Sequence, residues 1–260
     1  MPEEIDVSYE VKGAVALLTL QRPQTLNAMT RSLMQGLCAA VHRAEADPAV
    51  RALVLTGAGR GFCSGQDLRD RPPAGTDLEV ALMETYYPAI AALRQCRVPV
   101  VVAVNGVAAG AGFSLAMAGD FLFAAASARF IQSFGRIGLV PDLGSTYLLP
   151  RAIGRARALR LMLTGETLSA ADAHSWGLAT ECVPDAELLD RALAWAGQLA
   201  QGPTLAFCET RRLLDAAEGQ DFEAQFRAEL AAQNRMRASA DATEGVQAFL
   251  DKRPAVFSGR

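Results

Sequence analysis

The sequence has few of the residues on which several common catalytic centres depend. Only two histidines, His42 and His174, occur among 260 residues, and neither lies in an HExxH pattern. The five cysteines are odd in number and scattered, without a CxxC pair. This usage offers no metal-ligand spacing and is typical of a reducing compartment. We therefore expect a cytoplasmic protein without a bound metal.

Charge and hydropathy exclude two further classes of protein. A net charge of −3 and a pI near 5.5 argue against a nucleic-acid partner bound through bulk positive charge. No apolar run free of glycine and charge reaches the length that crosses a bilayer, and the acidic residues 1–6 do not have the form of a signal peptide. With 51% hydrophobic and 20% charged residues, the composition is that of a soluble globular domain.

The first half of the chain alternates strand and helix patterns. Residues 15–20, 52–56 and 98–104 are short apolar runs typical of buried strands, and residues 30–46 and 78–95 carry apolar side chains at helical spacing. A helix of small residues is expected after the third strand. This alternation predicts a largely parallel sheet flanked by helices.

The second half is predicted to be helix after helix. Apolar residues recur at three- and four-residue spacing in residues 155–163, 169–176, 187–200 and 222–238. In the last of these segments, Phe222, Phe226 and Leu230 share one face. We expect this face to lie in the core or in a subunit interface.

Two glycine-rich turns follow predicted strands, GAGRGFCSGQDL at residues 57–68 and NGVAAGAG at residues 105–112. Ligands of open α/β sheets bind outside the carboxyl ends of the strands, where both turns lie. The glycine spacings differ from the dinucleotide fingerprint G-x-G-x-x-G, and no Walker lysine follows either turn. We therefore expect two backbone N–H donors, one from each turn, that converge on a small anionic oxygen.

A single carboxylate, Asp142, lies in the apolar segment GLVPDLGST at residues 138–146. Loss of hydration raises the pKa of a carboxyl group, so that the group can both take and give a proton. On this segment alone, a turn aspartate that hydrogen-bonds to its own backbone is the simpler interpretation. The two glycine turns reverse that preference because they supply an anion for Asp142 to act against.

Four motifs occur in order along the chain: GFCSGQDL at residues 61–68, the run from Pro99 through residues 105–112, GLVPD at residues 138–142, and LTG at residues 163–165. In this combination the chain resembles the crotonase (enoyl-CoA hydratase/isomerase) superfamily over nearly its whole length. The resemblance implies an α/β fold, a crotonase-like spiral of ββα units with a C-terminal α-helical trimerisation region. It implies an acyl-CoA-binding core over residues 1–200 and a helical region over residues 201–260 for oligomerisation and active-site closure.

The resemblance also implies the ligand and the residues that contact it. The ligand is an acyl-CoA thioester, with no separate cofactor because coenzyme A is part of the substrate, and the protein is a homotrimer or hexamer. The implied oxyanion donors are the backbone N–H groups of Gln66 and Ala111. The other implied contacts are Arg22, Thr25, Leu26 and Ala28 at the nucleotide end, Ser64, Gly65, Asp67, Leu68 and Gly110 in the turns, Phe134, Ile137 and Leu143 in an apolar pocket around Asp142, and Lys252 and Phe257 from a neighbouring subunit. For Asp67 we expect a structural role or a contact with CoA.

Asp142 is the remaining acid/base candidate. Hydratases of the superfamily use two glutamates, and the corresponding positions here are Ser114 and Phe134, neither of which can move a proton in that role. The motifs look most like those of the isomerases of bacterial phenylacetate degradation, which convert ring-1,2-epoxyphenylacetyl-CoA to an oxepin thioester and also move double bonds. The resulting hypothesis is that Asp142 removes a proton beside the thioester and returns one to another carbon, while the two amides hold the enolate oxygen.

Alternative functions stay open at this stage. An enoyl-CoA hydratase would need an unconventional base. An aryl-CoA dehalogenase would use Asp142 as the nucleophile, but no histidine is visibly placed to activate water. A non-catalytic acyl-CoA-binding relative is disfavoured by the intact Asp142, and an RNA-binding one by the acidic charge. The sequence does not choose the acyl group.

Overall fold

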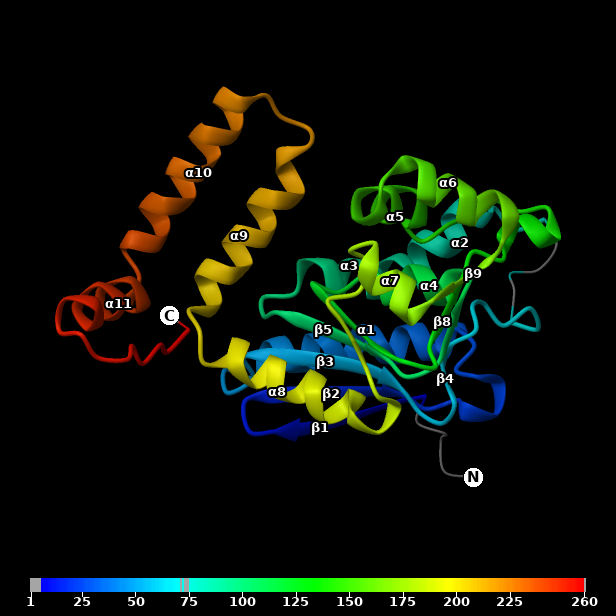
Figure 1. Ribbon diagram of the computed structural model, residues 1–260, viewed down its shortest axis with the longest axis horizontal. Helices are drawn as coiled ribbons and strands as arrows, with labels where there is room; N and C mark the ends of the chain where they lie inside the picture. The colour runs from blue at the N-terminus through cyan, green and yellow to red at the C-terminus, as the bar shows by residue number, and fades with distance from the viewer. Residues whose placement is uncertain (1–5, 71, 73–74, 260) are drawn as a thin grey trace.

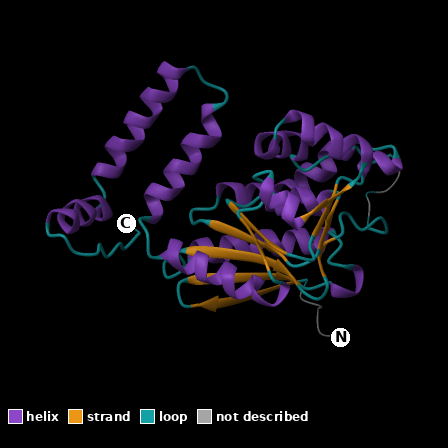
Figure 2. Ribbon diagram, in the orientation of Figure 1, coloured by secondary structure: helices purple, strands orange, loops and turns teal. Residues whose placement is uncertain are grey.

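The computed structural model describes residues 6–70, 72 and 75–259 (Figures 1 and 2). The strands are β1 (Val7–Lys12), β2 (Val15–Leu20), β3 (Ala52–Gly57), β4 (Gly61–Cys63), β5 (Val100–Val104), β6 (Val107–Ala109), β7 (Phe121–Ala125), β8 (Arg129–Ile131), β9 (Thr167–Ser169) and β10 (Glu181–Val183). The helices are α1 (Arg31–Ala46), α2 (Leu78–Thr85), α3 (Tyr87–Gln95), α4 (Ala111–Ala116), α5 (Ser145–Ile153), α6 (Arg155–Thr164), α7 (Ala170–Ser175), α8 (Leu188–Ala200), α9 (Thr204–Ala217), α10 (Phe222–Arg237) and α11 (Ala240–Leu250). Short 3₁₀ turns are η1 (Pro23–Thr25), η2 (Phe134–Ile137) and η3 (Asp185–Glu187).

The strands form two sheets, and from β3 to β8 successive strands alternate between them. The larger sheet has the order β1-β2-β3-β5-β7-β10, and the smaller one has the order β4-β6-β8-β9. In three successive units, β3–β4, β5–β6 and β7–β8, the first strand enters the larger sheet and the second enters the smaller sheet. All pairings in the larger sheet are parallel except that of β1 with β2. This winding confirms the expected spiral of ββα units.

The central strands of the larger sheet are buried on both faces, as parallel strands covered by helices require. Every residue of β3 and of β5 is buried. Helix α1 is capped by Thr30, whose hydroxyl accepts a hydrogen bond from the N–H of Leu33, and it packs against β1 and β2. Helix α8 packs against β2, β3 and β5 (Figure 1). The two helices thereby complete the core that carries the glycine turns.

Several element boundaries differ from those expected. The single helix expected over residues 78–95 is divided into α2 and α3 at Tyr86, because Pro88 lies in the first turn of α3, where a missing N–H costs least. The strand expected from residue 98 begins at Val100. The three-residue strands β4, β6 and β8 were not expected, since they are too short to show a period of two.

Helices α9 to α11 extend to one side of the α/β body (Figure 1). Two ion pairs join α9 to the body, Arg94–Asp215 at 2.6 Å and Arg211–Asp120 at 2.8 Å. On α10, Phe222 is 86% exposed. Phe226 and Leu230 are about half exposed, which rules out the core position for this face within one chain and leaves the interface alternative. None of the described helices is both long and apolar enough to span a membrane.

Helix α4 packs directly on β4, and this contact depends on a glycine. A Cβ atom placed on Gly112 would lie 2.1 Å from the carbonyl oxygen of Cys63, closer than any side chain can come. By contrast, a Cβ atom on Gly197 in α8 would meet open space. The small size of Gly112 is therefore what lets the two glycine turns approach each other.

We predict that Gly112→Ala lowers the free energy of unfolding by about 1–3 kcal/mol, because α4 must move away from β4. The matched control, Gly197→Ala, should raise it by about 0.5–1 kcal/mol, since alanine is the better helix former. Urea unfolding followed by circular dichroism measures both. Equal stability of the two variants would contradict the close packing of α4 on β4.

Candidate active site

The first glycine turn leaves one N–H group pointing away from its neighbours. Met29 donates its N–H to the carbonyl of Gly65 at 2.8 Å and accepts the N–H of Asp67 at 2.8 Å. In such a parallel bridge the residue between the two bonded groups faces the other way, and that residue is Gln66. Gln66 N–H has no backbone acceptor among the described residues. It is therefore free to bind a ligand.

The second glycine turn supplies another free donor beside the first. Ala111 is the first residue of α4, so its N–H has no acceptor within the helix. A Cβ atom on Gly65, where φ is +104°, would lie 2.9 Å from the carbonyl oxygen of Ala109 and 3.7 Å from the nitrogen of Ala111. The two turns are thus in contact. The segments that carry the two expected oxyanion donors lie side by side.

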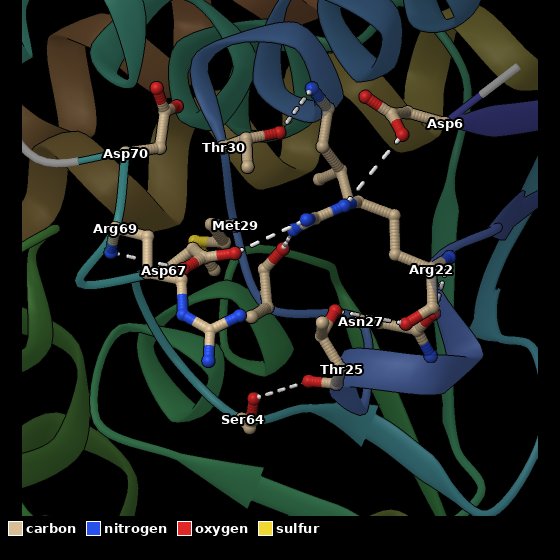
Figure 3. Close-up of polar contacts among 12 residues, drawn as sticks. Asp6, Arg22, Thr25, Asn27, Met29, Thr30, Ser64, Asp67, Arg69 and Asp70 are labelled. Atoms are coloured by element: carbon tan, nitrogen blue, oxygen red, sulfur yellow. Dashed lines mark hydrogen bonds and ion pairs between the residues drawn. The ribbon is translucent and has the colours of Figure 1, made fainter. Parts of the chain in front are cut away.

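The Arg22 side chain anchors the first turn by reaching across to Asp67 (Figure 3). Nη2 of Arg22 donates to Oδ2 of Asp67 at 3.1 Å, and Nη1 donates to the carbonyl of Ala28. Oδ1 of Asp67 accepts the N–H of Arg69 at 3.1 Å. The hydrogen bond from Arg69, together with the Arg22 guanidinium, keeps the pKa of Asp67 below its usual range. The Asp67 side chain therefore holds the turn in shape.

The segment expected at the nucleotide end is tied to the same turn (Figure 3). Oγ of Ser64 donates to the carbonyl of Thr25 at 3.0 Å. Leu26 and Asn27 both have positive φ, and the buried amide of Asn27 donates to the carbonyls of Ala58 and Gly61 at 2.9 and 2.8 Å. Asn27 was not among the residues singled out from the sequence, because its role is visible only once the two segments meet.

The other expected contact residues differ in burial and in their distance from the glycine turns. Ala28 is buried, whereas Leu68, two residues after Gln66 in the chain, is 62% exposed. Lys252 and Phe257 lie in the C-terminal segment, on the far side of the molecule from β4 and β8 (Figure 1). The Phe257 ring packs against Gly245 of α11. Within one chain these two residues do not reach the turns, and their contribution from a neighbouring subunit stays a prediction.

Asp142 lies in the loop between η2 and α5. The next two residues, Leu143 and Gly144, have φ of +48° and +81°, so the chain bends sharply after the aspartate. Oγ of Ser114 in α4 donates to the carbonyl oxygen of Asp142 at 2.9 Å. The residue at one of the two glutamate positions of the hydratases therefore anchors the Asp142 loop to the helix that begins at Ala111.

The Asp142 carboxyl group is poised to change protonation state. Its Oδ1 atom is buried and has no hydrogen-bond partner among the described residues. Burial raises the pKa of Asp142 to about 6, and the group's own backbone N–H offsets only part of this effect. Both the acid and the base form are thus accessible close to neutral pH.

The three apolar residues expected around Asp142 differ in burial. Phe134 is buried, and its ring lies 3.9 Å from where a Cβ atom of Gly110 would be. Leu143 packs against the core. Ile137 ends the η2 turn just before the left-handed Gly138 and is 61% exposed. The contact of these residues with a ligand stays a prediction.

Next to this loop lies an apolar cleft of about 390 Å³ between α2–α3 and α5. Its lining includes Leu82, Met83, Ile90, Leu143 and Leu148. Such a surface suits a hydrocarbon group better than a charged one.

Tyr86 is a site residue that the sequence did not reveal. It lies at the break between α2 and α3, is only 2% exposed, and places its hydroxyl 3.5 Å from the carbonyl of Met29. Burial raises the pKa of Tyr86, the Gln66 side chain lowers it in part, and the charge of Asp142 raises it further. The tyrosine therefore lies near both a proposed oxyanion residue and the candidate acid/base.

The structure supports neither a cysteine nucleophile nor a metal centre among the described residues. Burial raises the pKa of Cys63 to about 12, which keeps the thiol protonated and excludes it as a nucleophile. Among the residues that the structure describes, no group of three histidine, cysteine, aspartate or glutamate side chains is placed to hold a metal ion.

We predict that Asp142→Asn stabilises the protein in a pH-dependent way. The pKa of Asp142 is about 6 in the folded protein and about 4 in the unfolded chain, so the stability associated with the neutral carboxyl is present below pH 4 and lost as the pH rises through 6. The variant should gain about 1–3 kcal/mol at pH 7.5 and almost nothing at pH 4. Urea unfolding at both pH values tests this, with Glu229→Gln as an exposed control. A gain that is independent of pH would contradict the raised pKa.

Known proteins resemble this chain along its whole length. Residues 10–260 match the family model described as enoyl-CoA hydratase/isomerase. The chain is 46% identical to the "Probable enoyl-CoA hydratase" of Rhodobacter capsulatus (98% of each chain covered) and 44% identical to the "1,2-epoxyphenylacetyl-CoA isomerase" of Escherichia coli (99% of each). The crystal structure of an enoyl-CoA hydratase from Polaromonas sp. superposes with a TM-score of 0.90 at 34% identity, over 96% of this chain and 99% of that one. The chain belongs to the enoyl-CoA hydratase/isomerase family, the crotonase superfamily.

Proposed function

We propose that the protein is an acyl-CoA isomerase in which Asp142 moves a proton between two carbons of a CoA thioester. The observation that carries this proposal is the Asp142 carboxyl group, whose Oδ1 atom is buried and has no hydrogen-bond partner among the described residues. Its pKa is about 6, and its loop is anchored to the helix that supplies one free N–H donor. The 44% identity with an isomerase supports the same reaction class.

The proposed reaction needs one carboxylate and one oxyanion hole. Asp142 removes a proton from the carbon beside the thioester, and the negative charge moves to the thioester oxygen. The N–H groups of Gln66 and Ala111 bind this oxygen, and losing one such donor typically costs about 10²–10³ in rate. The protonated Asp142, after its proton has exchanged with water, then donates a proton to a carbon further along the acyl chain. The double bond shifts, and no atom is gained or lost.

The proposed acyl group is apolar, either an open-chain enoyl group or the ring-1,2-epoxyphenylacetyl group that the Escherichia coli relative's name contains. The apolar cleft beside Leu143 is consistent with both. CoA is part of the substrate, and the proposal involves no further cofactor. We place the reaction in the cytoplasm, in line with the scattered free cysteines.

Hydration is the second candidate, because a relative with 46% identity is named as an enoyl-CoA hydratase. The side chains at the two glutamate positions argue against it. Ser114 donates its hydroxyl to the Asp142 carbonyl, and Phe134 is a buried hydrocarbon. A hydratase of this sequence would have to activate water with Asp142 alone.

The isomerase proposal predicts a distinct isotope pattern. In deuterated water, the wild-type enzyme should convert a 3-enoyl-CoA to the 2-enoyl-CoA, with deuterium entering the substrate carbons and no added oxygen. Asp142→Asn should lower kcat by at least about 10³ while acyl-CoA binding stays within a few-fold, because the variant keeps the shape of the site but has no base. Mass spectrometry and nuclear magnetic resonance of the product give mass and label position. A product that carries an added water would establish hydration instead, and retained turnover by the variant would exclude Asp142 as the base.

We further propose that the chain forms a homotrimer or a hexamer through its helical region, which would bring Lys252 and Phe257 of one subunit to the site of another. The support is the concentration of exposed apolar side chains on α10 and α11: Phe222 (86% exposed), Phe249 (83%) and Leu250 (67%). Such a patch is rarely left open on a monomer.

This assembly predicts a particle of three or six chains in light scattering coupled to size-exclusion chromatography. Phe249→Glu together with Phe222→Glu should shift the protein to smaller particles, because charged groups disfavour burial in an interface. Val11→Glu, on the exposed edge strand β1, is the control and should leave the particle size unchanged. A monomeric wild-type protein would contradict the assembly.

A further inference from the structure

The apolar cleft beside the Asp142 loop shares one of its ends with a second cavity. The cleft, of about 390 Å³, is lined by Leu143, the residue that follows Asp142. Arg94 of α3 and Tyr147 and Leu148 of α5 line both this cleft and a neighbouring cavity of about 360 Å³. These three residues therefore separate the two spaces, and we call them the end wall.

The two spaces differ in character. On the side of Asp142 the cleft is lined mainly by hydrocarbon, including Leu82, Met83 and Ile90. An alkyl chain gains free energy with each methylene that it buries there. Beyond the end wall the chain would have to displace water from charged groups, which is unfavourable. Besides Arg94, the charged side chains that line this second cavity are Asp120, Arg151, Asp215 and Glu218.

Helix α9 holds both sides of the end wall through ion pairs. Asp215 of α9 accepts a hydrogen bond from Nη2 of Arg94 at 2.6 Å. A third ion pair between α9 and the body joins Glu218, the C-cap residue of α9, to Arg151 of α5. The Arg151 guanidinium lies over the Tyr147 ring, 3.5 Å from its centroid. Figure 1 shows α9 on the side of the body where α3 and α5 lie.

The position of Asp215 shows which way the Arg94 side chain extends. Asp215 lines the polar cavity but is not among the described residues that line the cleft, so the guanidinium that it binds lies on the cavity side. The aliphatic stem of Arg94 is left for the cleft. The two side chains are 24% and 43% exposed, and ion pairs this exposed add little to stability. The main effect of the pair is therefore to hold a long side chain across the end of the cleft.

We propose that the end wall sets the length of the acyl group that the protein accepts, and that helix α9 holds the wall closed through Asp215 and Glu218. The inference rests on the proposed function and narrows its substrate class to short or compact apolar acyl groups. Arg94 and Tyr147 are the residues that determine this specificity. Because they are tied to the helical region and not to the glycine turns, chain length and proton transfer depend on different parts of the molecule.

The first test uses the wild-type protein alone and measures the affinity of four saturated esters by isothermal titration calorimetry: butyryl-, hexanoyl-, octanoyl- and decanoyl-CoA. The Kd should fall by about fourfold for each methylene added within the cleft and should stop falling before decanoyl-CoA. An affinity that rises evenly across the whole series, or one that does not depend on chain length, would overturn the end wall.

Variants then test the charges in the wall. Arg94→Leu combined with Asp215→Leu replaces an ion pair by hydrocarbon, a change that folded proteins often tolerate. This double variant should bind decanoyl-CoA at least tenfold more tightly than the wild-type protein does, with butyryl-CoA binding within twofold. Tyr147→Ala, which shortens the wall from the α5 side, should gain at least threefold for decanoyl-CoA. The matched control is Arg191→Leu combined with Glu181→Leu, a partly exposed ion pair that lines neither space, and it should bind both esters as the wild type does.

Two results with the variants would also overturn the inference. One is an unchanged affinity for decanoyl-CoA, and the other is an equal change for both esters, which is what a purely structural role of Arg94 and Tyr147 would give. Turnover of 3-hexenoyl-CoA, measured on the same samples, reports the proposed function separately. Turnover together with an even rise in affinity refutes the end wall alone. A break in the series without turnover supports the end wall while refuting the isomerase.

Discussion

The contact between the two glycine turns is the constraint on which the rest of the site depends. Gly65 lies against Ala109 and Ala111, and Gly112 lies against Cys63, at separations that leave no room for a side chain. The spiral of ββα units brings these segments together, because the second strand of each unit enters the same small sheet. The N–H of Gln66 and that of Ala111 thereby lie on touching segments. Ser114, one helical turn further along α4, then holds the Asp142 loop.

The site keeps a polar atom buried without a partner, which a protein optimised only for stability would avoid. Oδ1 of Asp142 has no hydrogen-bond partner among the described residues, and Leu143 has a left-handed backbone. Around them the structure is firmly bonded: Arg22 holds Asp67, Asn27 joins two loops, and the central strands β3 and β5 are buried. A rigid frame around a carboxyl group that can change its protonation state is what a preorganised proton-transfer site requires.

Much of the fold could be predicted from the sequence, and Asp142 could be singled out as the candidate acid/base, a role that stays a prediction. Long elements with a clear period, such as α1, α8 and β3, fall within a residue or two of the expected bounds. The three-residue strands carry no period, and Pro88 divides a helix that apolar spacing alone makes continuous. Tyr86 and Asn27 could not be found, because their neighbours are distant in sequence. The exposure of Ile137 could not be found either, because apolar character does not tell which way a short turn faces. The roles of the remaining site residues stay predictions.

The proposed reaction depends most on Asp142 as a base whose pKa is about 6. The most direct measurement is the pH dependence of kcat/KM for isomerisation of a 3-enoyl-CoA between pH 4.5 and 8.5, which reports the ionisation of groups in the free enzyme. Because the carboxylate form must take the first proton, kcat/KM should rise with pH and reach half its maximum near pH 6. A profile that is flat across this range, or that falls as the pH rises through 6, would contradict the assignment.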